Sequence, residues 1–270
     1  MRIFILLLLL SSCELAENLI GAENKIDSSF NDSTCGDNCD GGDNTVSSVE
    51  DQIVSFWKMS ETGGTQSRND SFGGSTLVHG AGTLFSTSGQ VGSGIQCSSM
   101  NGSNYFYVSS PTSAYNFGTG TDYSVAFWAK LNSTLAANQI LVEFNYSTPF
   151  FRTFVNSSST DLTVNADNGF PLTASSAFPS FGIWYHFTIL VDRDSGISIY
   201  RDGSLISSDS NPISSNFIGV ADLYVCGGRN GGGPALTDGF DGDMDSVGVW
   251  NRLLNSTEIQ ALYNGNNTLD

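Results

Sequence analysis

Short apolar and aromatic runs alternate with clusters of Gly, Ser, Asn and Asp from Gln52 onward, and this texture limits the fold more than any other feature. The run at residues 123–129 shows the pattern residue by residue. Val125, Phe127 and Ala129 fall on one face of an extended strand, and Ser124, Ala126 and Trp128 fall on the other. Such alternation predicts β-strands, and the polar clusters between the runs predict turns.

Similar runs recur along the rest of the chain. They cover residues 53–57, 105–108, 140–144, 150–155, 184–191, 196–200, 223–226 and 244–250. Arg201-Asp202-Gly203 follows one of them with the Asp-Gly signal of a tight hairpin. Together with 30 glycines, these features predict an all-β fold of two packed antiparallel sheets.

One helix is predicted near the end of the chain. Asn255 is a favourable N-cap, and Glu258 follows it at capping-box spacing. Ile259, Leu262 and Tyr263 lie at i, i+3 and i+4 and form one apolar face, and an Asn-Gly pair follows. We therefore expect a short C-terminal helix that lies on the sandwich.

The beginning of the sequence predicts export. Arg2 precedes an unbroken apolar run over residues 3–10. As a helix this run spans about 12 Å, far less than the ~30 Å core of a bilayer, so it is typical of a signal peptide and not of a membrane span. The Leu-Ser-Ser-Cys at 10–13 resembles the bacterial lipobox, which implies that Cys13 is lipidated. The alternative is an ordinary secretory signal with an incidental cysteine.

Residues 14–50 are interpreted as an acidic, flexible tether. Lys25 is the only basic residue in this stretch, which is rich in Asp, Glu, Asn, Ser and Gly and poor in aromatics. Such a segment buries too little apolar surface to offset the entropy of ordering. The chain as a whole has a formal net charge of −17, which argues against nucleic acid as a partner because phosphate backbones would repel it.

Five cysteines are present. If Cys13 carries a lipid, Cys35, Cys39, Cys97 and Cys226 remain as an even set in an oxidising compartment, and they are the candidates for disulfides. Cys35 and Cys39 are close enough in sequence to bridge, and Cys97 with Cys226 would join two parts of the main domain. A metal site at Cys35 and Cys39 is disfavoured, since no histidine or second cysteine pair stands nearby.

Several segments of the main domain carry a family resemblance. They are Phe-Trp-Lys-Met-Ser-Glu at 56–61, Asn-Asp-Ser-Phe-Gly-Gly at 69–74, residues 94–108 and 123–130, Trp-Tyr-His at 184–186, Ile-Tyr-Arg-Asp-Gly at 199–203, and the stretch from Phe-Asp-Gly-Asp-Met-Asp at 240–245 to the terminal helix. In this order they resemble the LamG-like jelly-roll family of the concanavalin A-like lectin/glucanase superfamily. The resemblance covers residues 51–266 and leaves 267–270 as a tail. It implies a two-sheet antiparallel jelly-roll sandwich.

Large rings inside the strand-like runs are expected in the core. Trp128, Trp184 and Trp250 are predicted to fill space between layers, with sugar stacking as the alternative. His186 alternates with apolar neighbours and has no acid or nucleophile nearby in sequence, which favours a structural histidine over a catalytic one.

The superfamily includes glycosidases, whose chemistry uses two carboxylates a few ångströms apart. The glucanase relatives place them in a Glu-x-Asp-x-x-Glu pattern on one strand, and that pattern is absent here. Within the sandwich the glutamates are Glu61, Glu143 and Glu258, and Glu143 has no second glutamate on its strand. The chain is therefore predicted not to be an enzyme, with a glycoside hydrolase as the weakest alternative.

Many members of the superfamily hold one structural Ca²⁺ between an early loop and the last strand. The positions that resemble those ligands are Asp70 and Asp245, so the resemblance implies a structural calcium site there. Without the ion, Asp70 would be a turn-forming residue and Asp245 an exposed acid at a strand edge.

The ligand-binding face cannot be identified from the sequence. Candidates are Tyr115, Phe117, Phe150, Phe151 and the glycine-rich segment 227–239, although loop aromatics more often pack against their own domain. The function predicted is a non-catalytic, exported binding module for a glycan or an extracellular protein, held at the cell envelope or surface only through a lipid, or otherwise secreted. The alternative is a structural or adhesive subunit of a surface assembly.

Overall fold

The computed structural model describes residues 48–62, 67–81, 85–97, 105–108, 113–144, 150–166, 171–214, 222–228, 239–265 and 269. The chain divides into two units, Met1–Val46 and Ser47–Asp270. The predicted signal peptide, Cys13, Cys35, Cys39 and nearly all of the predicted tether lie outside the described residues. In the part that is described, no helix is long and apolar enough to cross a membrane.

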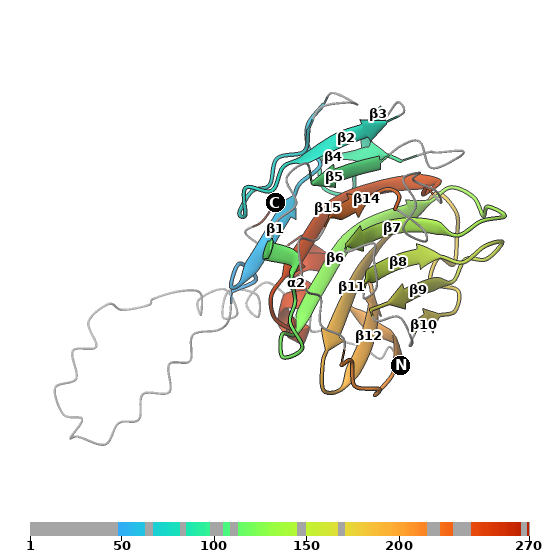
Figure 1. Ribbon diagram of the computed structural model, residues 1–270. Helices are drawn as coiled ribbons and strands as arrows, with labels where there is room; N and C mark the ends of the chain where they lie inside the picture. Colours follow the sequence, from blue (N-terminus) through green and yellow to red (C-terminus); the bar gives the residue numbers. More distant parts are fainter. Residues whose placement is uncertain are drawn as a thin grey trace, which may run out of the picture. The chain divides into compact units, whose positions relative to one another are not determined.

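Two antiparallel sheets form the second unit, as predicted (Figure 1). Sheet A contains, in order across the sheet, β13 (Ser204–Ser208), β12 (Gly196–Arg201), β11 (Trp184–Asp192), β6 (Tyr123–Leu131), β15 (Gly242–Trp250), β4 (Ser93–Gln96) and β3 (Phe85–Ser88), and β1 (Ile53–Trp57) also pairs with β15. Sheet B contains β10 (Pro171–Ala174), β9 (Leu162–Asn165), β8 (Phe151–Val155), β7 (Gln139–Phe144), β14 (Leu223–Val225), β5 (Tyr105–Val108) and β2 (Leu77–Ala81). The 3₁₀-helix η1 (Ser113–Tyr115) precedes β6.

The main core lies between the sheets and is rich in aromatic rings. Val125, Phe127 and Ala129 of β6 all belong to it, which confirms the alternation read from the sequence. From sheet B, Phe144 and Phe151 stack with their ring centroids 4.5 Å apart. Apolar burial of this kind contributes roughly 25 cal/mol per Å² and is the dominant favourable term in folding.

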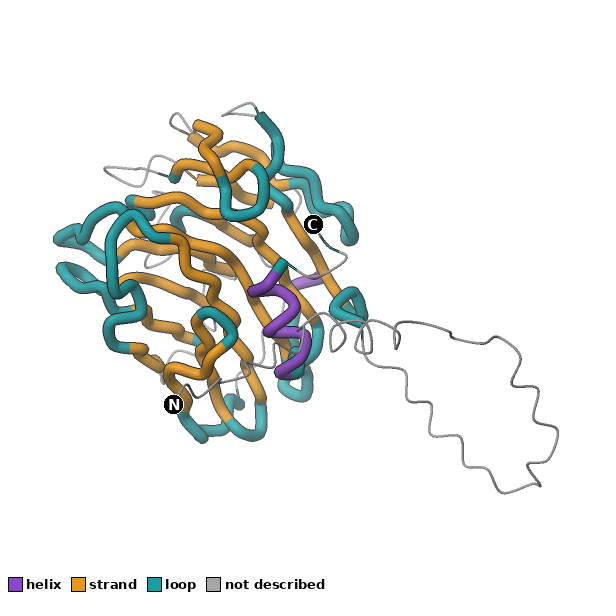
Figure 2. The backbone as a smooth tube through the Cα atoms, turned by 180° about the vertical axis from the view of Figure 1, so that it is seen from behind, coloured by secondary structure: helices purple, strands orange, loops and turns teal. Residues whose placement is uncertain are grey.

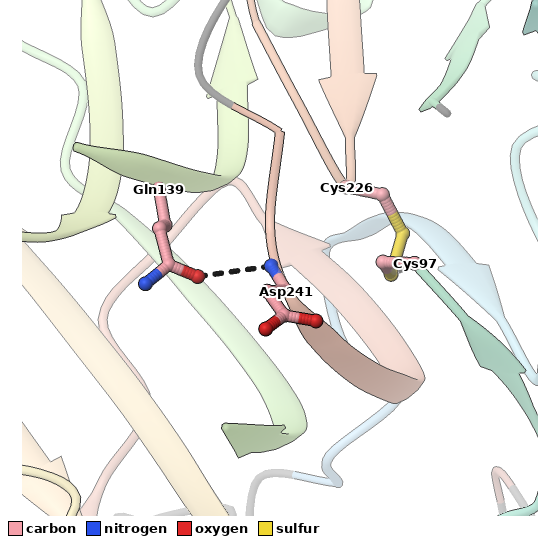
Figure 3. Close-up of a disulfide and its surroundings, with 4 residues drawn as sticks. All are labelled: Cys97, Gln139, Cys226 and Asp241. Carbon is pink, nitrogen blue, oxygen red and sulfur yellow. Dashed lines mark hydrogen bonds between the residues drawn. A yellow bond between two sulfur atoms is a disulfide. The ribbon is translucent and has the colours of Figure 1, made fainter. Parts of the chain in front are cut away.

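A disulfide joins the two layers. Cys97 follows β4 of sheet A, and Cys226 follows β14 of sheet B (Figure 3). This pairing was one of those that the sequence allowed. Nearby, the side chain of Gln139 in β7 accepts a hydrogen bond of 2.9 Å from the backbone N–H of Asp241, just before β15. The bond and the disulfide both connect sheet B to the segment that enters sheet A.

The predicted helix is present as α2 (Ser256–Asn264), and it lies against the strands on one side of the molecule (Figure 2). The side chain of Asn255 accepts from the backbone N–H groups of Thr257 and Glu258, and Glu258 reaches back to the N–H of Asn255. Gly265 ends the helix with φ of 66°, in the left-handed region that glycine adopts without strain.

The outer face of sheet A is covered. Ile259 and Leu262 of α2 pack with Phe56, Ala126 and Trp250 in a second apolar cluster. Val49 and Leu269 belong to the same cluster, so the folded unit extends slightly beyond residues 51–266 at both ends. The beginning of the described chain and its end therefore meet on this face.

Candidate functional site

The outer face of sheet B carries a continuous line of aromatic and polar side chains. The strand register places Tyr107 opposite Tyr224, Tyr224 opposite Glu143, Glu143 opposite Arg152, and Arg152 opposite Asn165. Their neighbours along each strand, such as Phe106, Val225 and Phe144, point into the core. Because side chains alternate across a strand, these five residues share the opposite face. We call them the outer row.

A buried ion pair forms the centre of the outer row. The Nε of Arg152 donates to a carboxylate oxygen of Glu143. Glu143 is completely buried, and the guanidinium of Arg152 lies 4.7 Å from the ring centroid of Phe150. Gly228 packs directly on the carboxyl group, since a Cβ at that position would lie 2.8 Å from it. The charges of Glu143 and Arg152 are thus shielded from bulk water and matched to each other.

Three tyrosines form one end of this face. The rings of Tyr105, Tyr107 and Tyr224 lie 5.9–6.2 Å apart, centroid to centroid. The Tyr105 ring rests directly over Gly80 of β2, where an added Cβ would come within 1.8 Å of it. The hydroxyl of Tyr224 donates to Asp222. Flat rings with attached hydroxyl groups suit ligands that present both apolar surface and hydroxyls.

The other end is polar and uncharged. Asn165 is partly exposed, and Thr173 of β10 is exposed at the edge of the sheet. The hydroxyl of Thr163 on β9 lies 2.8 Å from that of Thr173 and donates to Asn156. These short hydroxyl and amide groups can donate or accept hydrogen bonds without carrying charge.

The aromatic residues proposed from the sequence as ligand contacts have other positions. Tyr115, Phe117 and Phe151 are buried in the core, in agreement with the alternative that loop aromatics pack against their own domain. The Tyr115 hydroxyl lies 2.8 Å from the hydroxyl of Ser55, and burial raises the pKa of Tyr115 to about 12. Phe150 lies beside Arg152, next to the outer row. Of the glycine-rich segment 227–239, residues 229–238 lie outside the described residues.

The three tryptophans occupy different positions. Trp250 is fully buried in the cluster beneath α2, and its Nε1 donates to the carbonyl oxygen of Val49. Trp128 is nearly buried, and its ring packs against the rings of His186 and Tyr263. Trp184 is partly exposed, and the ammonium group of Lys130 lies 5.0 Å from the centroid of its ring. Trp250 and Trp128 thus pack on the outer face of sheet A. The expectation from the sequence, that they fill space between the two sheets, is wrong for these two residues.

His186 is a buried, neutral histidine beneath α2. It is 3% exposed, its ring centroid lies 5.0 Å from that of Trp128, and Nδ1 has no hydrogen-bond partner. Burial lowers its pKa to about 3. Among the described residues no carboxylate or nucleophile is paired with the ring, which agrees with the structural role predicted for it.

Asp70 anchors a loop. Its Oδ1 accepts from the backbone N–H groups of Phe56 and Phe72, and its Oδ2 accepts from that of Ser75. A carboxylate offers about four acceptor positions, so three of them are already used. This is the turn-forming role that the sequence analysis gave as the alternative to calcium.

Asp245 lies on β15 and is fully buried. The sequence had predicted an exposed acid at this position if no calcium ion is bound. Its Oδ2 accepts a hydrogen bond of 2.9 Å from the backbone N–H of Val91, and burial raises its pKa to about 7. Among the residues that the structure describes, no group of three or more His, Cys, Asp or Glu side chains could hold a metal ion. The described surroundings of Asp70 and Asp245 thus do not form a calcium cluster, and the calcium site stays a prediction.

The glutamates of the sandwich are all engaged with cations or helix ends. Glu258 pairs with Arg252 and caps α2, and Glu61 lies 3.8 Å from Arg68. The neighbours of Glu143 in the outer row are Tyr224 and Arg152. A glycosidase of the usual type would need a second carboxylate close to Glu143.

Comparison with known families identifies this architecture. The family model described as "Concanavalin A-like lectin/glucanases superfamily" matches residues 101–260. The chain belongs to this superfamily. The LamG-like resemblance read from the sequence is thereby confirmed. No curated protein sequence matches the chain.

Solved structures of the superfamily type share the fold at low sequence identity. The binding domain of Paraclostridial Mosquitocidal Protein 1 is 15% identical with a TM-score of 0.62, over 81% of this chain and 53% of that one. Domain 4 of AbnA, an arabinanase from Geobacillus stearothermophilus in complex with arabinotriose, is 16% identical with a TM-score of 0.56, over 78% and 98%. A Trypanosoma rangeli sialidase in complex with sialic acid is 16% identical with a TM-score of 0.58, over 81% and 33%. The chain thus spans about half of the first protein and a third of the sialidase.

Sequence reasoning missed the outer row because its members come from five strands. The local signal was present: Tyr105 and Tyr107 alternate with buried Phe106, and Glu143 stands between the core residues Val142 and Phe144. What the sequence lacks is the order β9-β8-β7-β14-β5, which alone brings these positions into one line.

Proposed function

We propose that this protein is a non-catalytic binding module of the concanavalin A-like superfamily that recognises a glycan through the outer row of sheet B. The observation that carries the proposal is the difference between the two outer faces. The face of sheet A is covered by α2, whereas the outer row of sheet B places a buried ion pair and the buried Tyr224 in one line with Tyr107 and Asn165, which are partly exposed. A few polar groups placed among aromatic rings are typical of ligand sites.

The solved relatives support a binding role for this fold. One is named as the binding domain of a mosquitocidal protein, and the arabinanase domain was solved with arabinotriose. A botulinum neurotoxin binding domain was solved with rat synaptotagmin II, which is the precedent for a protein partner. We favour a glycan for this chain because the outer row combines rings with uncharged hydrogen-bonding groups.

Absence of catalysis is part of the proposal. Glu143 is buried and paired with Arg152, so its carboxylate is already engaged within the domain. A catalytic nucleophile needs a free carboxylate oxygen near the sugar. Hydrolysis of p-nitrophenyl glycosides above the background of a Glu143→Gln variant would contradict this part of the proposal.

We further propose that the domain is exported and displayed through a lipid at Cys13. Val49 packs beneath α2 on the outer face of sheet A, so the chain enters the domain on the side away from the outer row. Mass spectrometry of the mature protein should find a diacylglyceryl group on Cys13, and a Cys13→Ser variant should move to the aqueous phase; unchanged partitioning would refute the anchor.

A glycan array with purified wild-type protein, run with and without Ca²⁺, tests the binding role. Tyr107→Ala should lower any signal at least about tenfold, because stacking of a ligand on an aromatic ring contributes on the order of 1–3 kcal/mol. Phe181→Ala removes an equally aromatic side chain, 51% exposed, that precedes β11 of sheet A, and should leave binding unchanged. Equal losses in both variants, or binding to no glycan, would contradict the proposal.

A structural or adhesive role remains the second candidate, and one observation favours it. β13 lies at the edge of sheet A, contains neither a charge nor a proline, and exposes 52% of Leu205. Natural edge strands usually carry a charged residue or a proline, which prevents pairing with other chains. Sedimentation velocity over a range of concentrations should reveal assembly that Leu205→Lys abolishes if this role holds, and a monomer throughout would exclude it.

A further inference from the structure

The loop at residues 175–183, between β10 and β11, presents two large apolar side chains to solvent. Phe181 is 51% exposed and Ile183 is 50% exposed. Among the described residues four large apolar side chains are exposed, and two of them therefore lie here, only two positions apart. Trp184, which follows them as the first residue of β11, is partly exposed. We call residues 181–184 the apolar tip, and adjacent exposed apolar residues of this kind mark contact sites.

The backbone that carries the apolar tip is held in place. The N–H of Gly182 donates to the carbonyl oxygen of Leu131, at the end of β6, over 2.8 Å. Before the tip, Phe178 is buried in the main core, and the guanidinium of Arg201 donates to the carbonyl oxygen of Ala177 over 3.2 Å. A loop that is fixed in this way loses little conformational entropy when its tip enters a contact.

The apolar tip lies in a charge-free stretch of an acidic chain. Residues 168–191 contain no Asp, Glu, Lys or Arg, although the chain as a whole has a formal net charge of −17. His186, the histidine of this stretch, is buried, and burial lowers its pKa to about 3, so it is neutral as well. Charged side chains are costly to carry into the acyl region of a bilayer. The stretch therefore suits a loop that enters a lipid surface.

Trp184 and Lys130 follow the tip in an order typical of a membrane interface. They pair across β11 and β6, and the ammonium group of Lys130 lies 5.0 Å from the Trp184 ring and 2.5 Å from a carboxylate oxygen of Asp243. Tryptophan and lysine both favour the headgroup level, where an apolar body meets water. Phe181 and Ile183 stand beyond them, at the depth where purely apolar side chains are stable.

The apolar tip and the entry of the chain into the domain lie at opposite ends of β6. At one end Leu131 accepts from Gly182, and at the other Ser124 pairs with Trp250, whose indole N–H donates to Val49. From residue 124 to residue 131 an extended strand covers about 23 Å, at ~3.3 Å per residue. The tip is thus remote from residue 49, where the preceding part of the chain joins the domain.

We propose that the apolar tip inserts reversibly into the surface of an uncharged phospholipid bilayer. Phe181 and Ile183 enter the boundary between headgroups and acyl chains, and Trp184 stays at the level of the headgroups. The force is the burial of apolar surface, which needs no charge on the lipid. This contact goes beyond the proposed glycan binding and uses none of the residues of the outer row.

Flotation with phosphatidylcholine vesicles tests the proposal on the full chain. Cys13→Ser is present in every protein compared, so no lipid at that residue contributes, and the other N-terminal residues are common to all. Phe181→Ser/Ile183→Ser should lower the partition coefficient at least about tenfold, because it removes the apolar surface that is buried on insertion. Phe72→Ser is the matched control: it removes a ring of similar exposure, 42%, from another loop, and should leave partitioning unchanged.

Trp184 provides an internal probe of the contact. The other tryptophans, Trp57, Trp128 and Trp250, are 0%, 5% and 0% exposed. Brominated phosphatidylcholine, which quenches tryptophan at close range, should therefore act on Trp184. Trp184→Phe keeps an apolar ring at the interface, so it should still bind vesicles and lose the quenching. Quenching that persists in Trp184→Phe would assign the contact to another part of the chain and overturn the proposal.

Lipid charge separates insertion from electrostatic attraction. Because the chain is acidic, phosphatidylserine in the vesicles should weaken binding at about 20 mM salt, and added salt should restore it. Stronger binding to the anionic vesicles, no binding to phosphatidylcholine, or equal binding by Phe181→Ser/Ile183→Ser overturns the proposal. Sedimentation velocity completes the test: if the parent protein binds no vesicle and forms dimers that this variant abolishes, the tip is a contact between copies of the chain instead.

Discussion

The ion pair of Glu143 and Arg152 shows how far a single residue depends on its neighbour. Both side chains point away from the core by strand register, and both are nevertheless buried. Glu143 has no second glutamate on its own strand, and its partner Arg152 comes from the adjacent strand β8. Pairing of this kind cannot be read from spacing, because it is set by the register between β7 and β8.

Removing one member of this pair should destabilise the fold more than removing both. Arg152→Leu leaves an uncompensated buried carboxylate and should cost on the order of 3–5 kcal/mol in the free energy of unfolding. The double variant Glu143→Leu/Arg152→Leu should recover most of that loss. Urea denaturation of the three proteins measures both effects, and a double variant as unstable as Arg152→Leu would argue against the pair as the cause.

His186 should make the fold sensitive to acid. Its pKa is lowered to about 3 in the native state, whereas an unfolded histidine titrates near 6.5. Between these values the unfolded chain binds a proton that the native one excludes, so stability is complete above about pH 6.5 and falls as the pH drops toward 3, by about 1.4 kcal/mol per unit at most.

The comparison is made with His186→Phe at each pH, because Asp245 acts in the opposite direction. Burial raises the pKa of Asp245 to about 7, so its contribution weakens as the pH rises through that range. Asp245 is present in both wild type and His186→Phe, so its contribution cancels in the difference between their free energies of unfolding. The stability of wild type relative to His186→Phe should fall between pH 6.5 and 4 and stay constant above pH 7.5. A parallel pH profile for the two proteins would show that His186 does not carry the effect.

At the scale of elements, alternation and turn chemistry predicted the long central strands well. β6 and α2 were found where the pattern of Val125, Phe127 and Ala129 and the capping residues had placed them. The Asp202-Gly203 turn also holds, with both residues at positive φ (50° and 76°), as a tight hairpin turn requires. Among the strands missed, β3 and β13 are short, rich in serine and lie at the edges of sheet A, where a strand buries too few side chains to leave an apolar pattern.

The N-cap of α2 can be tested on its own. Asn255→Ala removes the acceptor of two backbone N–H groups and should lower the free energy of unfolding by about 1 kcal/mol. Ser256→Ala, one position later and exposed, is the control and should change stability by less than about 0.5 kcal/mol. Thermal melts followed by circular dichroism would report both, and equal shifts would speak against the capping bond.

For the whole molecule, the disulfide is the one covalent link between the layers among the described residues. It closes a loop of 129 residues between Cys97 and Cys226. The sequence allowed this pairing and could not choose it, because proximity across two sheets depends on the complete strand order. The candidate site has the same origin, because the outer row forms only once five strands of sheet B have paired.

Cys97→Ser/Cys226→Ser should lower the free energy of unfolding by about 2–5 kcal/mol, as expected when a long loop is released in the unfolded chain. Guanidinium denaturation of the double variant against the oxidised wild type measures this. Wild type treated with dithiothreitol should match the variant, and unchanged stability in both would mean that the link adds nothing to the fold.

The position of Val49 beneath α2 has a mechanical consequence. A pull on the chain ahead of Ser48 would act first on the carbonyl groups of Ser48 and Val49, which Arg252 and Trp250 hold through hydrogen bonds, and only then on the pairing of β1 with β15. With the lipid anchor that we propose at Cys13, drag on the domain would be transmitted to the junction of β15 with the terminal helix.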